Sequence, residues 1–127
     1  GLGDRVTHRV GDARDDDLGD GEWDVVFVAN LVHHFDDAGN RDLCRRAARA
    51  LKPGGVLVLQ EMIRPVGNER AQAGALADLY FAALSESGTW SYEELADWQR
   101  GAGLEPLRPV RFVSQPGLGQ QPARKPR

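Results

Sequence analysis

Polar residues that follow apolar segments are the first candidates for chemistry in this sequence. Asp12 follows a short alternating run, His33 follows a longer apolar run, and Glu61 follows a third, 28 residues beyond His33. A histidine and a glutamate suit proton transfer, because a carboxylate bonded to one imidazole nitrogen fixes the tautomer and stabilises the imidazolium. A free imidazole has a pKa of about 6.5 and is therefore largely neutral at pH 7, so it can accept a proton. These residues predict a ligand-binding or catalytic site without naming its reaction.

A strand, a helix and a second strand must position these residues. The run 24–29 consists of apolar, mostly β-branched and aromatic residues, which is typical of a central strand covered on both faces of a parallel sheet. Asp36 and Asp37 offer a helix N-cap, apolar residues follow at helical spacing, and the turn 52–55 ends that helix before a buried strand at 56–59. This order predicts a βαβ crossover with parallel strands, hence an α/β fold. Ligands of such sheets bind outside the carboxyl ends of the strands, where His33 and Glu61 would meet.

The remaining elements are read from the same kinds of pattern. Alternation over 6–10 predicts a first strand, and the acidic, glycine-containing stretch 12–22 predicts a solvated loop. A helix is expected over 69–84, with an apolar stripe of Leu76, Leu79, Tyr80 and Ala83.

Towards the end of the sequence, the capping box from Ser91 to Glu94 predicts a helix up to about residue 102. Two closing strands are expected within 107–113 and 120–124. Pro109 and Pro122 favour edge positions for them, because proline cannot donate to a strand ladder.

Composition narrows the class of protein. The 127 residues fit one compact domain, and a net charge of −3 gives no basic surplus for nucleic acid. The single Cys44 cannot form an internal disulfide, and no apolar run approaches the roughly 20 residues that cross a bilayer. We therefore expect a soluble, cytoplasmic protein without nucleic-acid or membrane partners. The opening Gly1-Leu2-Gly3-Asp4 suggests a fragment.

Three motifs in order make a specific resemblance possible. They are Gly11-Asp12, the stretch from Asp24 to Asp37 that includes Asn30-Leu31-Val32-His33-His34-Phe35, and the turn Leu51-Lys52-Pro53-Gly54-Gly55. Over about residues 5–64 the chain resembles the second half of a class I S-adenosylmethionine-dependent methyltransferase, nearest to the small-molecule O-methyltransferases, which include the plant caffeate-type enzymes. The resemblance implies a Rossmann-like sheet with helices on both faces but without its N-terminal strands. Residues 1–127 would be the C-terminal portion of one catalytic domain, without the glycine-rich cofactor loop.

The resemblance also implies roles for residues. His33 falls on the general base of these enzymes and Glu61 on the glutamate that orients it. S-adenosyl-L-methionine would be the cofactor, with Asp12 near its adenine amino group and with Ala13, Ala29 and Asn30 beside it. The partner would be a small, perhaps aromatic, methyl acceptor, and oxygen is the favoured atom over nitrogen or carbon.

Other interpretations of the same residues stay open. His33 could be a structural residue satisfied by backbone, His34 could exchange roles with it, and Glu61 could pair with Arg64 instead. Tyr80, Phe81 and Trp90 could wall an acceptor pocket, although aromatic residues at helical spacing more often form core. Relatives often carry a lysine at the position of Ala29 and another acid near 87–90, and this chain has neither.

At the level of the whole chain, the alternative function is a catalytically silent methyltransferase fragment. A nucleotide-dependent oxidoreductase is disfavoured by the 51–55 turn. A metal site from His8, Asp12, His33 and His34 is disfavoured because their spacing is irregular.

Overall fold

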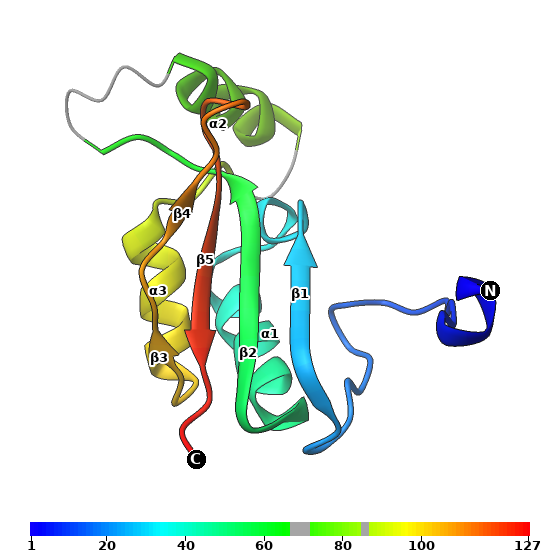
Figure 1. The fold of residues 1–127 in the computed structure, drawn as a ribbon. Helices are drawn as coiled ribbons and strands as arrows, with labels where there is room; N and C mark the ends of the chain where they lie inside the picture. The colour runs from blue at the N-terminus through cyan, green and yellow to red at the C-terminus, as the bar shows by residue number, and fades with distance from the viewer. Residues whose placement is uncertain (67–71, 85–86) are drawn as a thin grey trace.

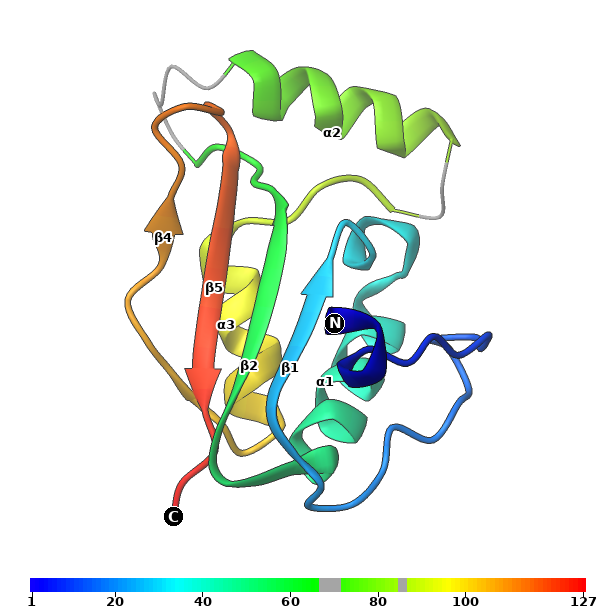
Figure 2. The ribbon, with the colours of Figure 1, turned by 45° about the vertical axis from the view of Figure 1, so that its right-hand side comes forward.

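The computed structural model describes residues 1–66, 72–84 and 87–127. Their strands form one sheet in the order β1-β2-β5-β3, and β4 also pairs with β5. The bounds of the strands are β1 Trp23–Ala29, β2 Leu51–Met62, β3 Glu105–Pro106, β4 Val110–Arg111 and β5 Leu118–Arg124. The helices are α1 Asp37–Ala50, α2 Gln72–Leu84 and α3 Tyr92–Gly101, and short 3-10 turns cover Leu2–Arg5 and Val32–His34. Figures 1 and 2 show the sheet from two directions.

The predicted βαβ unit is confirmed. β1 and β2 are parallel, in a register that pairs Val28 with Leu59 and Ala29 with Gln60. Asp36 caps α1, since its side chain accepts a hydrogen bond from the Gly39 amide at 2.8 Å. The crossover therefore brings the carboxyl ends of β1 and β2 to the same end of the sheet (Figure 1).

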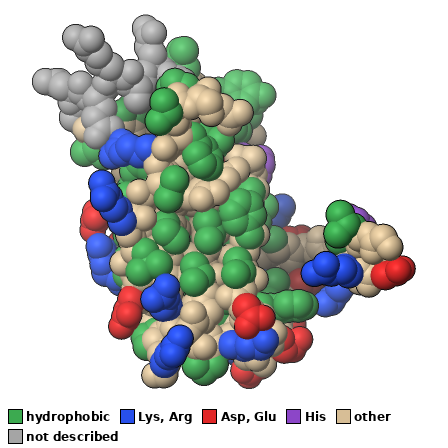
Figure 3. All heavy atoms as spheres, viewed as in Figure 1, with side chains coloured by type: hydrophobic (Ala, Val, Ile, Leu, Met, Phe, Trp, Pro, Cys, Tyr) green, Lys and Arg blue, Asp and Glu red, His purple; other side chains and the backbone are tan. Residues whose placement is uncertain are grey.

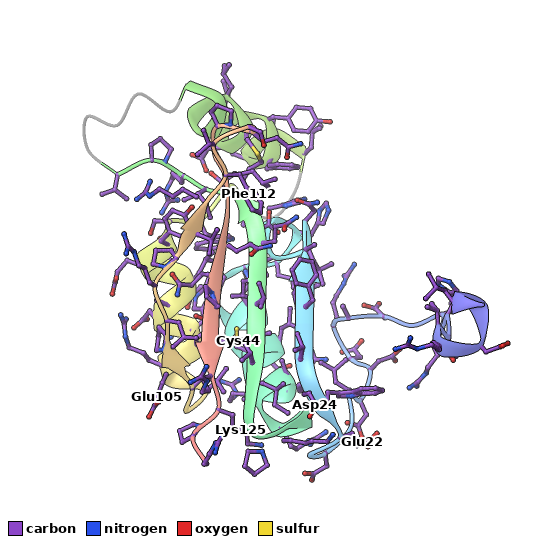
Figure 4. The ribbon with its side chains drawn as sticks, in the orientation of Figure 1. Glu22, Asp24, Cys44, Glu105, Phe112 and Lys125 are labelled. Carbon is purple, nitrogen blue, oxygen red and sulfur yellow. The ribbon has the colours of Figure 1, made fainter. Side chains whose placement is uncertain are left out.

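The helices α1 and α3 share one face of the sheet. Buried residues of α1, Cys44 among them, belong to the same core cluster as Leu57 and Leu59 of β2 (Figure 4). The capping box of α3 is present as predicted, with hydrogen bonds in both directions between Ser91 and Glu94. On the other face of the described sheet, apolar side chains such as Val25 and Phe27 are more than half exposed (Figure 3). Among the described residues, helices thus cover one face rather than both.

Two expectations about the first strands were wrong. Residues 6–10 form no strand, and Val6 and Val10 are exposed. β1 is the border of the sheet rather than a central strand, because β2 is the one strand that pairs with it in the described part of the chain. A strand needs a partner for its backbone groups, and alternation in a sequence cannot supply one.

The closing strands also differ from the prediction. β5 is longer than expected and runs inside the sheet, between β2 and the short strands β3 and β4, so an edge position for Pro122 was wrong. The Pro122 carbonyl accepts from the Leu107 amide at 2.8 Å. The donor-free nitrogen of Pro122 faces the same side, where residues 107–109 interrupt the outer strand, so no ladder bond is lost. Pro109 itself lies in that interruption, at the outer border of the sheet.

The helix α2 lies across the carboxyl ends of β1 and β2 (Figures 1 and 2). Residues 69–71 of the predicted helix lie outside the described residues. The predicted stripe does not face the core, because Leu76, Leu79, Tyr80 and Ala83 are all exposed. Instead α2 contacts the domain through Phe81 and Asp78. None of the helices that the structure describes has the length and apolar character of a membrane span.

Candidate active site

His33 and Glu61 meet at the carboxyl end of the sheet. His33 lies in the 3-10 turn that follows β1, and Glu61 continues the buried face of β2 that holds Leu57 and Leu59. The distance from His33 Nδ1 to Glu61 Oε2 is 2.8 Å, and the two side chains are 7% and 3% exposed. The predicted contact between the two residues is therefore present and shielded from water.

Both oxygens of the Glu61 carboxylate form hydrogen bonds with the turn that carries His33. Oε1 accepts from the backbone amide of Val32 at 3.0 Å, while Oε2 binds the imidazole. Where the Glu61 carboxylate accepts this bond, His33 Nδ1 is the donor, and the contact selects one tautomer of the ring. The alternative pairing with Arg64 is not formed. Arg64 binds both oxygens of Glu94 at 2.6 Å and the Thr89 carbonyl at 3.0 Å.

An aromatic ring of α2 covers His33. Phe81 stacks on the imidazole with ring centroids 3.9 Å apart and an interplanar angle of 24°. Tyr80 of the same helix is exposed, and Trp90 packs edge-on against the buried Trp98 at 4.9 Å. Of the three aromatic residues considered for an acceptor pocket, Phe81 contacts the candidate base, whereas Trp90 is half-buried and packs against the core cluster. His34 is exposed, and its ring is tilted against that of His33.

The backbone turns sharply where β1 ends. Asn30 has a φ of 52°, in the left-handed region that asparagine adopts more readily than most other non-glycine residues. Its amide donates to the Gln60 carbonyl at 2.9 Å, which ties the turn to β2. Ala29 and Asn30 are both exposed at this end of the sheet, and their contact with a cofactor stays a prediction.

Asp12 and Ala13 lie beside β1 rather than next to His33. With Leu18, Trp23 and Val26 they line a hollow of about 460 Å³ that does not include Ala29 or Asn30. The Asp12 side chain is 59% exposed, and its Oδ1 accepts from the Arg14 amide at 2.9 Å. Arg9, Asp16 and Asp17 also line the hollow. Apolar side chains with carboxylates among them can hold a flat ring that bears an amino group.

The sequence analysis missed the residue that fastens this segment. Arg46 of α1 has a side chain that is only 15% exposed. Its guanidinium donates to the carbonyls of Ala13 at 2.7 Å and Asp16 at 2.9 Å, and to the Asp42 carboxylate at 2.7 Å. It also holds the pKa of Asp42 below its usual value. In the described chain, no group of three histidine, cysteine or acidic side chains gathers to hold a metal.

The comparison with protein families decides the identity of the fold. Residues 1–105 match the sequence model of a protein family that is described as the O-methyltransferase domain. The chain belongs to the O-methyltransferase domain family. The α/β fold and the resemblance found in the sequence are thereby confirmed.

Two curated relatives come from Streptomyces species. The 3-hydroxy-5-methyl-1-naphthoate 3-O-methyltransferase of Streptomyces sahachiroi is 27% identical over 114 residues, which are 90% of this chain and 33% of that protein. The L-tyrosine C(3)-methyltransferase of Streptomyces lavendulae is 36% identical over 117 residues, 88% of this chain and 31% of that protein. The chain therefore spans about a third of the length of these relatives.

A solved structure of the same family agrees in fold. The mitomycin 7-O-methyltransferase MmcR superimposes with a TM-score of 0.82 at 25% identity, over 97% of this chain and 35% of that one. Since the superposition covers nearly all of this chain and about a third of that one, the mixed sheet described above corresponds to part of the fold of that protein.

Proposed function

We propose that the protein containing this chain transfers the methyl group of S-adenosylmethionine to a hydroxyl group of a small aromatic metabolite, with His33 as general base. The observation that carries the proposal is the buried contact of 2.8 Å between His33 Nδ1 and Glu61 Oε2 at the carboxyl ends of two parallel strands. This is the end of an α/β sheet where ligands bind. Family membership supports the reaction class.

The chain's own residues would manage the proton. With Nδ1 donating to Glu61, the basic lone pair of the His33 ring is on Nε2. The acceptor hydroxyl would give its proton to Nε2 as its oxygen forms the bond to the methyl carbon, while the carbon–sulfur bond breaks and leaves S-adenosylhomocysteine. Glu61 would stabilise the imidazolium that results. General-base help of this kind contributes about 10² to 10⁴ in rate.

The residues present fit the adenine end of the cofactor. When bound, S-adenosylmethionine supplies a sulfonium methyl group as the electrophile. The exposed Asp12 carboxylate at the rim of the hollow would accept from the adenine amino group, and the apolar side chains of Leu18, Trp23 and Val26 would contact the ring. Ala13, Ala29 and Asn30 would contribute backbone along the same ligand.

The relatives' names bear on the acceptor. The Streptomyces sahachiroi relative is named for a 3-O position on a hydroxynaphthoate and the Streptomyces lavendulae relative for C(3) of L-tyrosine. Removal of a phenolic proton makes both the oxygen and the neighbouring ring carbons more nucleophilic. One base can therefore serve either atom, and oxygen is the proposed target here.

The test uses the complete protein product of the gene. S-adenosylmethionine binding is measured by calorimetry, and a panel of phenols, catechols and hydroxynaphthoates is then assayed for methylated products by mass spectrometry. Saturable binding together with a product methylated on oxygen supports the proposal. Binding without any product over the panel would count against the proposed acceptor class. Absence of binding at tens of micromolar protein would reject the activity and favour a fold without chemistry.

A further inference from the structure

The turn that carries His33 is held by a buried amide of α1. Asn40 is fully buried, and its Nδ2 lies 2.9 Å from the Val32 carbonyl and 3.2 Å from the Phe35 carbonyl. The two hydrogens of that amide can satisfy both carbonyls, which bracket His33 in the sequence. Asn40 thus fastens the turn on both sides of the candidate base.

Residues of the segment after α2 also contact this turn. The Ser87 hydroxyl lies 2.9 Å from the His33 carbonyl and 2.6 Å from the Phe35 carbonyl, and Trp90 Nε1 donates to the Val32 carbonyl at 3.2 Å. Glu61 holds the Val32 amide. Because a 3-10 turn of this length has few backbone bonds of its own, these side-chain donors fix where the imidazole lies.

Burial of Asn40 has a cost that packing alone does not explain. Its Oδ1 is buried and has no hydrogen-bond partner among the residues that the structure describes. An apolar residue at this helix position would fill the space without that desolvation cost. What asparagine adds is the pair of N–H groups directed at the His33 turn.

We propose that Asn40 is a positioning residue for His33, which sets the imidazole at hydrogen-bonding distance from Glu61 and in line with the acceptor. This inference rests on the proposed function. Without the amide, each of the two carbonyls loses one side-chain donor. Trp90 still donates to the Val32 carbonyl and Ser87 to the Phe35 carbonyl, so the turn is held by fewer hydrogen bonds and gains freedom to move. A displacement of about 1 Å at a reacting group can lower a rate by about 10²-fold.

The matched control is Gln99 of α3. It is also a fully buried amide, its Nε2 donates to the Gln121 carbonyl at 2.9 Å, and its Oε1 likewise has no partner in the described part of the chain. Asn40→Leu and Gln99→Leu remove the same kind of group from two helices, and only the first of these amides binds the His33 turn.

The experiment compares both variants with the complete gene product. We expect Asn40→Leu to lower kcat for methyl transfer by about 10- to 100-fold with little change in KM for S-adenosylmethionine, and Gln99→Leu to keep kcat. In nitrogen-edited NMR, the Nδ1 proton that His33 shares with Glu61 should broaden or shift in Asn40→Leu and stay in place in Gln99→Leu. Equal kcat and equal spectra in the two variants would overturn the proposal.

A second variant covers failure of Asn40→Leu to fold. Ser87→Ala removes a donor to the same turn from a less buried position, and it should move the same Nδ1 proton resonance. If that resonance stays unchanged, the turn does not depend on these side-chain donors and the proposal falls. Should the wild type transfer no methyl group, the proposed function fails, while the NMR comparison still decides whether Asn40 positions His33.

Discussion

The two halves of the candidate site are built differently. The His33 turn is buried. It donates a hydrogen bond to Glu61 of β2 and accepts hydrogen bonds from α1 and from the segment after α2. The segment around Asp12 is exposed, and its described contacts with α1 come from arginines, with Arg46 the most buried of them. Proton transfer needs a fixed geometry, and the turn supplies it before any ligand arrives.

The sharpest way to break this contrast is to separate His33 from Glu61. We expect His33→Ala to lower kcat by about 10² to 10⁴ and Glu61→Gln to lower it by about 10- to 100-fold. Because the two residues act as one unit, the double variant should be no slower than His33→Ala alone.

The control for that cycle is His34→Ala, since His34 is exposed and outside the buried pair. It should retain the wild-type kcat. Additive losses in the double variant, or a large loss in His34→Ala, would contradict the role of the buried pair.

On the cofactor side, Asp12→Ala should weaken S-adenosylmethionine binding about tenfold, as expected for one hydrogen bond to a charged group. The rate at saturating cofactor should stay unchanged, because Asp12 lies apart from His33. The control is Asp15→Ala, a change in the same exposed loop, and calorimetry compares the affinities of the two variants for S-adenosylmethionine. Equal affinities in the two variants would remove Asp12 from the cofactor site.

Arg46→Ala should lower the free energy of unfolding by about 1 kcal/mol, because a part-buried donor to several acceptors is lost. Hydrogen exchange of the backbone amides of residues 13–17 should become faster. Arg45→Ala is the control, because the ion pair of Arg45 with Asp42 at 3.5 Å is exposed and Arg45 donates to no carbonyl of the 13–17 segment in the described part of the chain.

The effect of Arg46 should depend on pH. Arg46 lowers the pKa of Asp42 below the unfolded value of 3.8. That part of the stability is present above the unfolded value and is lost as the pH falls through the lower folded pKa. Urea denaturation at pH 7 and below pH 4 measures the free energy of unfolding of wild type and of Arg46→Ala. The difference between the two proteins should shrink in acid, and a difference that grows in acid would contradict this prediction.

The smallest expected effect concerns Cys44, in the packed core between α1 and the sheet. Burial raises the pKa of the Cys44 thiol to about 12, so the reactive thiolate is scarce at neutral pH. Alkylation at pH 8 should therefore be slow in the native protein and fast in urea. Rapid native labelling would mean that α1 opens readily and that the His33 turn is less fixed than described.

Local patterns predicted the parts of the molecule whose causes are local. Asp36, the apolar run of β1 and the glycine turn at 54 define the βαβ unit, and that unit alone brings His33 to Glu61. The border position of β1 and the absence of a strand at 6–10 depend on which other strands are available for pairing. The alternation of apolar and polar residues does not encode this.

The supports of His33 were harder to find because they are long-range. Ser87 lies 54 residues from the His33 carbonyl that it contacts, and no spacing rule links the two. Asn40 did leave a signal, since a polar residue interrupts the apolar face of α1 on which Leu43, Cys44 and Ala47 lie.

The most direct test of His33 as general base varies the acidity of the acceptor. Single-turnover methyl transfer is measured in wild type and in His33→Ala, with one phenol that titrates near about pH 10 and one acidic phenol of the same shape that is already ionised at the assay pH. We expect the loss of about 10² to 10⁴ for the first phenol and a nearly wild-type rate for the second, which has no proton to give. An equal loss for both phenols would contradict the account and leave His33 as a structural residue.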